Sequence, residues 1–254
     1  MKYLLSSALA LILVLGNSYG ALAQSEVTFL APSPIREQLE TLIKSFESKT
    51  NYKVNAAWGS GLGTKEQVAK GEGQDVSIMY APFPEALASG HIVAGSAKTI
   101  ASLHMAVAVR KGAARPDIST PEAVKRTFLA AKSISTVDPA MGSGGIVAQE
   151  IFRKLGISDQ VKPKMVFGAN GGVVHAAVAK GEAEMAVRYL NELNRSGLDI
   201  VGRLPREVST PGDVVGFIST HAKNPAGAKA LLDYLASSPE AAQVFKEAGM
   251  EPAR

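Results

Sequence analysis

Four short loops rich in glycine and serine carry residue types that can bind a small anion. They contain Ser33 in residues 32–35, Ser60 in 59–64, Gly144 in 142–145 and Gly171 in 170–172. Each loop follows a predicted strand and precedes a predicted helix, where unpaired backbone N–H groups and the positive end of the helix dipole face a ligand. A tight turn without a ligand explains any one loop, but the four together indicate an anion site.

Four ionisable side chains lie close to these loops in the sequence. Tyr189 ends a predicted strand and could donate its hydroxyl, although a half-buried ring with a wet hydroxyl is the ordinary alternative. Arg36 and Arg188 could each hold a carboxylate through two parallel hydrogen bonds, unless they are surface or ion-paired arginines. His175 lies one turn into its predicted helix, where it could act as an acid or base or simply pack.

Repeated units of strand, turn and helix must position these residues. The first predicted helix has Ile35, Leu39, Leu42 and Phe46 on one face, at helical spacing. The predicted strands span residues 26–30, 53–58, 75–80, 103–109, 133–137, 164–167, 183–190 and 213–219. The other predicted helices span residues 64–70, 120–132, 143–155, 171–180, 225–236 and 239–248. This alternation indicates an α/β fold with largely parallel sheets.

The order of these units predicts two lobes, with the chain passing from one lobe to the other twice. We expect residues 24–109 and 212–254 to form lobe 1 and residues 110–211 to form lobe 2. The crossings are expected near residues 109–114 and 204–214. Open parallel sheets bind ligands at the carboxyl ends of their strands, which is where the four loops lie.

The N-terminal residues have the order of a secretory signal peptide. Lys2 precedes an apolar stretch from Leu9 to Leu15, and small residues follow up to Ala23. We expect residues 1–23 to be removed near Ala23 and the protein to reach the periplasm. A membrane anchor is the alternative, but the apolar run is well short of the ~20 residues that a spanning helix needs. The chain has no cysteine, so it has no disulfide framework.

Composition argues against several other functions. The formal net charge is +4, of which one charge belongs to Lys2, and the basic residues form no run, so no nucleic acid partner is expected. His91, His104 and His221 are isolated in the sequence, and we predict no metal site. Residues 59–63 lack the acidic partner and full spacing of a dinucleotide-binding loop, and no cofactor is expected.

Several segments spread over the chain resemble the molybdate-binding proteins of ABC transporters. Residues 177–189, AVAKGEAEMAVRY, are similar to the helix, turn and strand that carry that family's binding tyrosine, and residues 238–249 look like its closing helix. Residues 67–76 resemble its Q-I-x-x-G-x-x-x-D stretch, and residues 143–146 stand where its third binding loop should be. The resemblance implies a two-lobed type II periplasmic binding protein fold, each lobe a mainly parallel sheet flanked by helices, with a ligand cleft between the lobes.

The resemblance also implies how a ligand is held. In that family serine hydroxyls, backbone N–H groups at helix N-termini and one tyrosine hold an oxyanion without a counter-charge. The matching positions are Ser33 and Ser60 for the hydroxyls, Gly144 and Gly171 for the backbone donors, and Tyr189 for the tyrosine. The implied function is capture of a molybdate-like oxyanion or a small carboxylate for an ABC permease, and we expect a monomer.

The sequence departs from the family pattern, and an enzyme remains the alternative. Glycine replaces residues that bear side chains at the two backbone-donor positions, which preserves N–H donation but not ligand identity. Aconitate isomerase resembles a periplasmic protein of this type and would move a proton along an allylic system. In that case His175 and Tyr189 would be the acid and base, while Arg36 and Arg188 would hold carboxylates. A structural or adhesive role is the third possibility.

Overall fold

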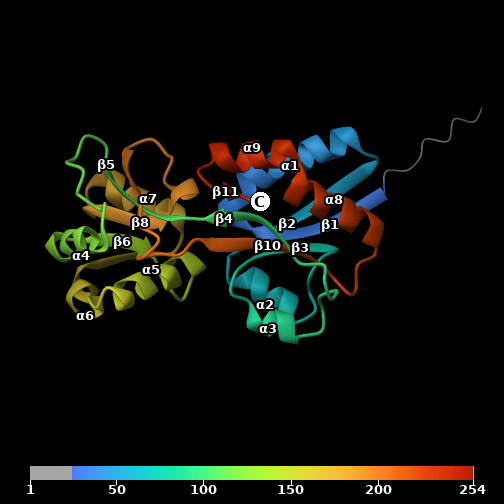
Figure 1. Cartoon of the computed structure of the whole chain (residues 1–254), viewed down its shortest axis with the longest axis horizontal. Helices are drawn as coiled ribbons and strands as arrows, with labels where there is room; N and C mark the ends of the chain where they lie inside the picture. The colour runs from blue at the N-terminus through green and yellow to red at the C-terminus, as the bar shows by residue number, and fades with distance from the viewer. Residues whose placement is uncertain (1–24, 254) are drawn as a thin grey trace, which may run out of the picture.

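Two separate sheets, each covered by helices, form the two lobes of the molecule (Figure 1). The computed structural model describes residues 25–253, so the predicted signal peptide and its cleavage site lie outside the described residues. The six-stranded sheet of lobe 1 has the order β11-β4-β10-β3-β1-β2. The five-stranded sheet of lobe 2 has the order β7-β6-β8-β5-β9.

Lobe 1 contains both ends of the described chain. Its strands are β1 (Ser25–Pro32), β2 (Tyr52–Gly59), β3 (Val76–Tyr80), β4 (Lys98–Leu103), β10 (Gly212–Ile218) and β11 (Glu251–Pro252). Its helices are η1 (Ser33–Ile35), α1 (Arg36–Lys49), α2 (Gly63–Ala69), α3 (Pro84–Ala88), α8 (Pro225–Ser237) and α9 (Pro239–Glu247). In Figure 1, α1, α8 and α9 lie on one side of this sheet and α2 and α3 on the other.

Lobe 2 is built from the middle of the chain. Its strands are β5 (Met105–Arg110), β6 (Ile134–Val137), β7 (Met165–Gly168), β8 (Met185–Tyr189) and β9 (Leu198–Arg203). Its helices are α4 (Pro121–Ala130), α5 (Ser143–Lys154), α6 (Ser158–Val161), η2 (Lys162–Lys164), α7 (Gly171–Lys180) and η3 (Leu190–Glu192). The structure therefore confirms a two-lobed α/β fold.

The strand directions are mixed, where the sequence predicted mainly parallel sheets. β1 runs parallel to β2 and β3, and β6 runs parallel to β7 and β8. β10 runs antiparallel to β3 and β4, and β5 runs antiparallel to β8 and β9. β5 is almost fully buried and so are the four residues 214–217 of β10, so their apolar runs look like those of buried parallel strands and do not reveal direction.

The first crossing between the lobes lies at His104, several residues earlier than expected. β4 ends at Leu103 in the sheet of lobe 1, and β5 begins at Met105 in the sheet of lobe 2. The sequence suggested one strand over residues 103–109 that belonged to lobe 1. Apolar residues stand on both sides of His104, so periodicity does not mark the crossing. The second crossing spans residues 204–211, between β9 and β10.

The predicted apolar face of the first helix is confirmed. Ile35, Leu39, Leu42 and Phe46 are all buried in the core of lobe 1. At the end of α1, Phe46 packs against Tyr52 and Tyr234, with ring centroids 5.9 and 5.6 Å apart. The core therefore fixes α1 against the sheet, and with it the loop that carries Ser33.

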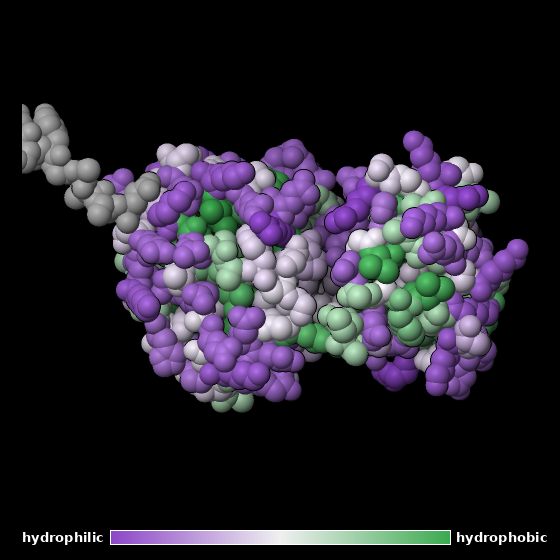
Figure 2. Space-filling view, turned by 180° about the vertical axis from the view of Figure 1, so that it is seen from behind, coloured by the Kyte–Doolittle hydropathy of each residue, from purple (hydrophilic) through white to green (hydrophobic). Residues whose placement is uncertain are grey.

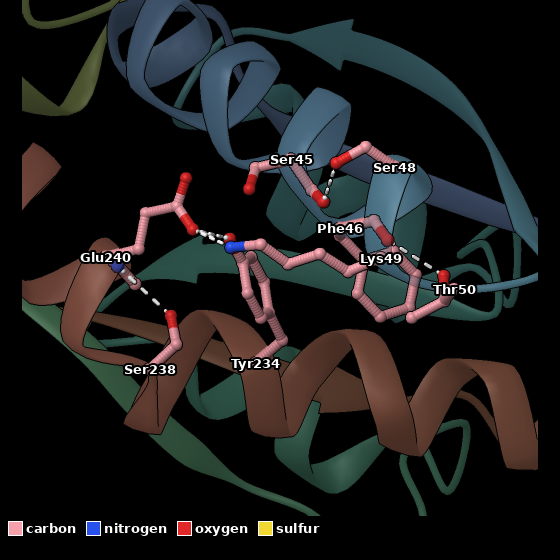
Figure 3. A network of polar contacts seen from close by, with 9 residues as sticks. Ser45, Phe46, Ser48, Lys49, Thr50, Tyr234, Ser238 and Glu240 are labelled. Carbon is pink, nitrogen blue, oxygen red and sulfur yellow. Dashed lines mark hydrogen bonds and ion pairs between the residues drawn. The ribbon is translucent and has the colours of Figure 1, made fainter.

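A polar network joins α1 to the two C-terminal helices (Figure 3). Lys49 at the end of α1 forms an ion pair with Glu240 in α9 and lies over the ring of Tyr234 in α8. The Tyr234 hydroxyl donates a hydrogen bond to the same carboxylate at 2.8 Å. The two closing helices thus fasten the end of the helix that begins at the cleft.

Seen from behind, polar residues cover most of both lobes, and the surface is indented between them (Figure 2).

Inside lobe 1, the buried Asp75 carboxylate accepts hydrogen bonds from the backbone N–H groups of Thr28 and Lys223. It thereby ties β1 to the loop before α8, a structural role for the aspartate of the 67–76 segment.

None of the helices within residues 25–253 is long and apolar enough to cross a bilayer.

Candidate ligand-binding site

A cavity of about 230 Å³ lies between the lobes, where the parallel strands of both sheets end. Its walls come from the ends of β1, β2 and β3 in lobe 1 and of β6, β7 and β8 in lobe 2. Parallel strands bring their carboxyl ends to one edge of a sheet, so six distant segments converge. The five residues that the family resemblance assigned to the ligand all line this cavity: Ser33, Ser60, Gly144, Gly171 and Tyr189.

Two serines form part of the lobe 1 wall. Ser33 follows β1 directly and begins η1, and Ser60 follows β2. The Ser60 Oγ accepts a hydrogen bond from the N–H of Gly63, the first residue of α2, at 2.9 Å. A hydroxyl that accepts one hydrogen bond keeps its own proton to donate. Ser60 can therefore hold the start of α2 and donate to a ligand at the same time.

The lobe 2 wall contains the N-termini of two helices. α7 begins at Gly171 and is capped by Asn170, whose side chain accepts from the N–H groups of Gly172 and Val173 at 2.9 and 3.2 Å. α5 begins at Ser143 after Gly142, without a side-chain cap. The first N–H groups of a helix have no partner within it. The start of α5, including Gly144, therefore offers backbone N–H donors to the cavity. At the start of α7, the corresponding N–H groups already donate to Asn170.

A buried ion pair stands in the same cavity. Arg188 near the end of β8 pairs with Glu192 in η3, and both side chains are less than a tenth exposed. Burial raises the pKa of Glu192, and the neighbouring Arg188 opposes that rise. The Arg188 Nη1 atom is buried and has no hydrogen-bond partner among residues 25–253. The cavity therefore contains a guanidinium group whose charge is partly compensated and one of whose donor nitrogens is unused.

The absence of a side chain at Gly171 makes room for this guanidinium. A Cβ atom at Gly171 would lie 2.3 Å from Arg188 Nη1, far inside van der Waals contact. The glycine that the sequence suggested as a backbone donor is thus also a spacer. The start of α7 and the arginine occupy neighbouring positions, so both can face the same anion.

Two tyrosines, one from each lobe, meet at the cavity. Tyr80 ends β3 and Tyr189 ends β8, and their rings pack edge to face with centroids 5.9 Å apart. Burial raises the pKa of Tyr189 to about 12, while a hydrogen bond with Ser143 opposes the rise. Burial also raises the pKa of Tyr80 well above its ordinary value. Both hydroxyls stay protonated at neutral pH and can donate hydrogen bonds.

Two predicted site residues lie outside the cavity. Arg36 is the first residue of α1, where its side chain is 55% exposed, pairs with Glu40 at 2.7 Å and lies over the ring of Trp58. His175 in α7 has its Nε2 atom 2.7 Å from the backbone oxygen of Ser196. Both side chains therefore have partners outside the cavity. Proximity in sequence to the loops was therefore misleading for Arg36 and His175.

The remaining histidines also lie away from the cavity. His91 and His221 are isolated in the sequence, but the structure brings their rings together, with Nδ1 of His91 3.0 Å from Nε2 of His221. His104 pairs with Glu251. Within residues 25–253, no three histidine, aspartate or glutamate side chains are grouped in a way that could hold a metal ion.

Sequence reasoning missed Tyr80 and Glu192. Tyr80 ends a predicted strand just as Tyr189 does, so the same argument could have identified it. Glu192 follows Arg188 by four residues, a spacing that suggests an ion pair on a helix, but a strand and a 3-10 turn carry this pair. Nothing in the local sequence indicates that the pair is buried in a cleft.

A family model described as bacterial extracellular solute-binding protein matches residues 27–251. Aconitate isomerase from a Pseudomonas species is 30% identical over 252 residues, covering 96% of this chain and 94% of the isomerase. The molybdate-binding protein ModA of Azotobacter vinelandii is 28% identical over 246 residues, covering 94% and 96% of the two chains. Both relatives are thus similar over nearly their whole length.

Solved structures show the same fold. The periplasmic molybdate-binding protein of Azotobacter vinelandii superposes with a TM-score of 0.71 at 20% identity, over 90% of this chain and 100% of that one. The sulfate-binding protein SubI of Mycobacterium tuberculosis gives a TM-score of 0.67 at 14% identity, over 90% and 87%. These structural matches support the type II periplasmic binding protein architecture.

Proposed function

The chain belongs to the bacterial extracellular solute-binding proteins, and on this basis we propose that its cavity captures a small carboxylate or a related oxyanion. The observation that carries the proposal is Arg188, a buried arginine of the cavity wall whose Nη1 atom has no hydrogen-bond partner within residues 25–253. A buried polar group without a partner is costly, and a ligand that accepts its hydrogen bond removes that cost. Arginine's planar fork matches a carboxylate especially well.

Neutral donors complete the proposed site. The hydroxyls of Ser33 and Ser60, the backbone N–H at Gly144 and the hydroxyl of Tyr189 would surround the ligand. The start of α7 at Gly171 would add the positive end of a helix dipole. A site that held its oxyanion with neutral donors alone would not need the arginine, so Arg188 favours a carboxylate over molybdate.

We further propose that the protein works in the periplasm as the capture component of an ABC transporter. The signal-like residues 1–23 would direct export and be removed near Ala23, and the mature monomer would deliver its ligand to a permease. The N-terminal sequence of the protein recovered from the periplasm tests the first step. A mature chain that starts far from Gln24, or that stays in the cytoplasm, would contradict it.

A thermal-shift screen tests the ligand class. Acetate, succinate and citrate are compared with molybdate, sulfate and phosphate, because a ligand at 100 times its dissociation constant adds about 2.7 kcal/mol of stability. We expect carboxylates to raise Tm in the natural protein but not in Arg188→Gln. The matched control is Arg126→Gln, because the Arg126 side chain is 70% exposed and lies outside the cavity. A shift with tetrahedral oxyanions alone, unaffected by Arg188→Gln, would contradict the proposal.

An isomerase is the second candidate, and Glu192 is the observation that favours it. Its carboxyl is buried beside Arg188 in the cavity, where a raised pKa suits a group that takes up and returns a proton. In this function Glu192 would remove an allylic proton, the double bond would shift, and the proton would return to the far carbon. Incubation with trans-aconitate, followed by proton NMR for the appearance of cis-aconitate, tests this. Turnover that Glu192→Gln abolishes would support the isomerase, and no formation of cis-aconitate would exclude it.

A further inference from the structure

Within residues 25–253, two polar atoms of residues that line the cavity are buried without a hydrogen-bond partner, and they come from different lobes. They are the hydroxyl of Tyr80 at the end of β3 and the Nη1 atom of Arg188 on β8. Buried donors in folded proteins are nearly always satisfied, so each such group calls for an explanation. A ligand that bridges the lobes would satisfy both at once.

The surrounding structure holds both donors in place. Tyr80 packs on the ring of Tyr189, and Gly61 lies so close that a Cβ atom there would be 3.1 Å from the Tyr80 ring. Glu192 fixes one side of the Arg188 guanidinium, and Gly171 leaves it space. In this arrangement neither group reaches another acceptor within residues 25–253. The pair is therefore preorganised for a ligand.

The walls and the size of the cavity indicate a ligand with a carbon skeleton. Pro34, Val137 and Met141 line it together with the polar groups, and a bare tetrahedral oxyanion makes no use of apolar walls. At about 30 Å³ per water, the 230 Å³ cavity holds about eight water-sized groups. An oxyanion of five heavy atoms fills much less of that space.

The donors also exceed what one carboxylate can use. A carboxylate has two oxygens with about four lone-pair sites. The hydroxyls of Ser33, Ser60 and Tyr80, Arg188 Nη1 and the N–H groups at the start of α5 together outnumber those sites. At least two acceptor groups on one ligand would engage them all.

We propose that the cavity selects a small polycarboxylate, with one carboxylate received jointly by Tyr80 and Arg188 and another by Ser33, Ser60 and the start of α5. This rests on the proposed function, carboxylate capture at Arg188, and adds Tyr80 as a residue that determines specificity. Because the hydroxyl of Tyr80 has no hydrogen-bond partner among the described residues, its proposed role is in binding and not in folding. Removing that hydroxyl should weaken the complex without weakening the fold.

Calorimetric titrations with three probes test the proposal. Butyrate, succinate and tricarballylate carry one, two and three carboxylates, and we expect the last two to bind at least tenfold more tightly than butyrate. Tyr80→Phe should weaken succinate and tricarballylate binding about tenfold while leaving the Tm of the free protein unchanged or higher. Ser60→Ala should weaken the two polycarboxylates in the same way but not butyrate, whose single carboxylate is expected at Arg188.

Tyr234→Phe is the matched control, because it removes a tyrosine hydroxyl in lobe 1 that lies outside the cavity (Figure 3). It should leave all three affinities unchanged. The proposal is overturned if polycarboxylates bind no better than butyrate, or if Tyr80→Phe leaves every affinity intact. In either case carboxylate binding that depends on Arg188 would leave the proposed function standing. If none of the three probes binds, both the proposed function and this inference fail.

Discussion

Gly171 and Arg188 show how a single missing side chain can shape a site. The guanidinium occupies the space that a side chain at position 171 would need. Since that contact involves the far end of a flexible side chain, the arginine can move aside without disturbing the fold. Substitution at Gly171 should therefore affect binding more than stability.

We predict that Gly171→Ala lowers carboxylate affinity by about tenfold or more, because it displaces Arg188 Nη1 from the cavity. Titration calorimetry measures the affinity, and thermal unfolding should show a change of only a few degrees. Gly212→Ala is the control, since a Cβ atom there meets nothing within 4 Å. Equal affinity in Gly171→Ala and the natural protein would show that Arg188 does not contact the ligand.

We predict that Glu192 makes ligand binding dependent on pH. Burial already raises the pKa of Glu192, and an anionic ligand beside it would raise that pKa further, so the complex holds more protons than the free protein. Arg188 and Arg195 lower the pKa of Glu192, and Tyr80 and Tyr189 also face it. Affinity should therefore be highest at low pH and fall as pH rises through the pKa of Glu192 in the complex.

The predicted pH dependence is at most tenfold in affinity per pH unit, the limit for uptake of one proton. Titrations of succinate between pH 5 and 8 measure it. Glu192→Gln should flatten the profile and tighten binding at pH 8, because Arg188 loses its compensating charge. Succinate titrates identically in both experiments, so the difference between the pH profiles of the natural protein and Glu192→Gln does not depend on the protonation of succinate. If the two profiles are parallel, the ligand does not change the pKa of Glu192.

At the residue level, the proposed neutral donors lie together more consistently than the proposed charged groups. Ser33, Ser60, Gly144, Gly171 and Tyr189 all line the cavity, because loops at strand ends are recognisable locally. Arg188 lines it as well, but Arg36 and His175 do not, since the direction of a helical side chain depends on how its helix docks. Whether these residues bind a ligand stays a prediction.

At the scale of elements, the starts of α5 and α7 determine which donors reach the cavity. Asn170 caps α7 next to the cavity, and Thr120 caps α4 in the same lobe by accepting from the N–H of Ala123 at 3.1 Å. Both caps stabilise a helix, but only the first changes the donors at the ligand. The two positions therefore form a matched pair.

We predict that Asn170→Ala and Thr120→Ala each cost about 1 kcal/mol of stability through the lost cap. Only Asn170→Ala should change ligand affinity, because it frees the N–H groups of Gly172 and Val173 at the cavity. Chemical denaturation measures the first effect and calorimetry the second. If Thr120→Ala changes ligand affinity as much as Asn170→Ala does, both changes in affinity would result from the lower stability of lobe 2 and not from the donors at the cavity.

Helices were easier to predict than strand partners. α7 has the predicted bounds, because Asn170 and Gly181 are local signals for its start and end, and Gly181 has a φ of 81°. The division of residues 98–110 between two sheets was not predicted, since pairing of β4 with β10 and β5 with β8 is decided by distant residues. β9 and the short β11 were missed for the same reason.

At the scale of the whole molecule, two crossings join lobes that have separate sheets. In each lobe a residue that lines the cavity has a buried donor without a partner in the described part of the chain, so a ligand bound to both would hold the lobes together. We predict that a saturating polycarboxylate lowers the radius of gyration in small-angle scattering. Tyr80→Phe should bind more weakly and need more ligand for the same compaction. Unchanged dimensions at saturation would show that the lobes do not close by hinge motion.

The most direct test of carboxylate capture between the lobes is a crystal structure with bromosuccinate, whose bromine is located by anomalous scattering. We predict one bromine peak in the cavity, with a carboxylate of the ligand on the Nη1 atom of Arg188 and hydrogen-bonded to the Tyr80 hydroxyl. A saturated crystal with its bromine outside the cavity, or with Arg188 still paired only to Glu192, would contradict the account.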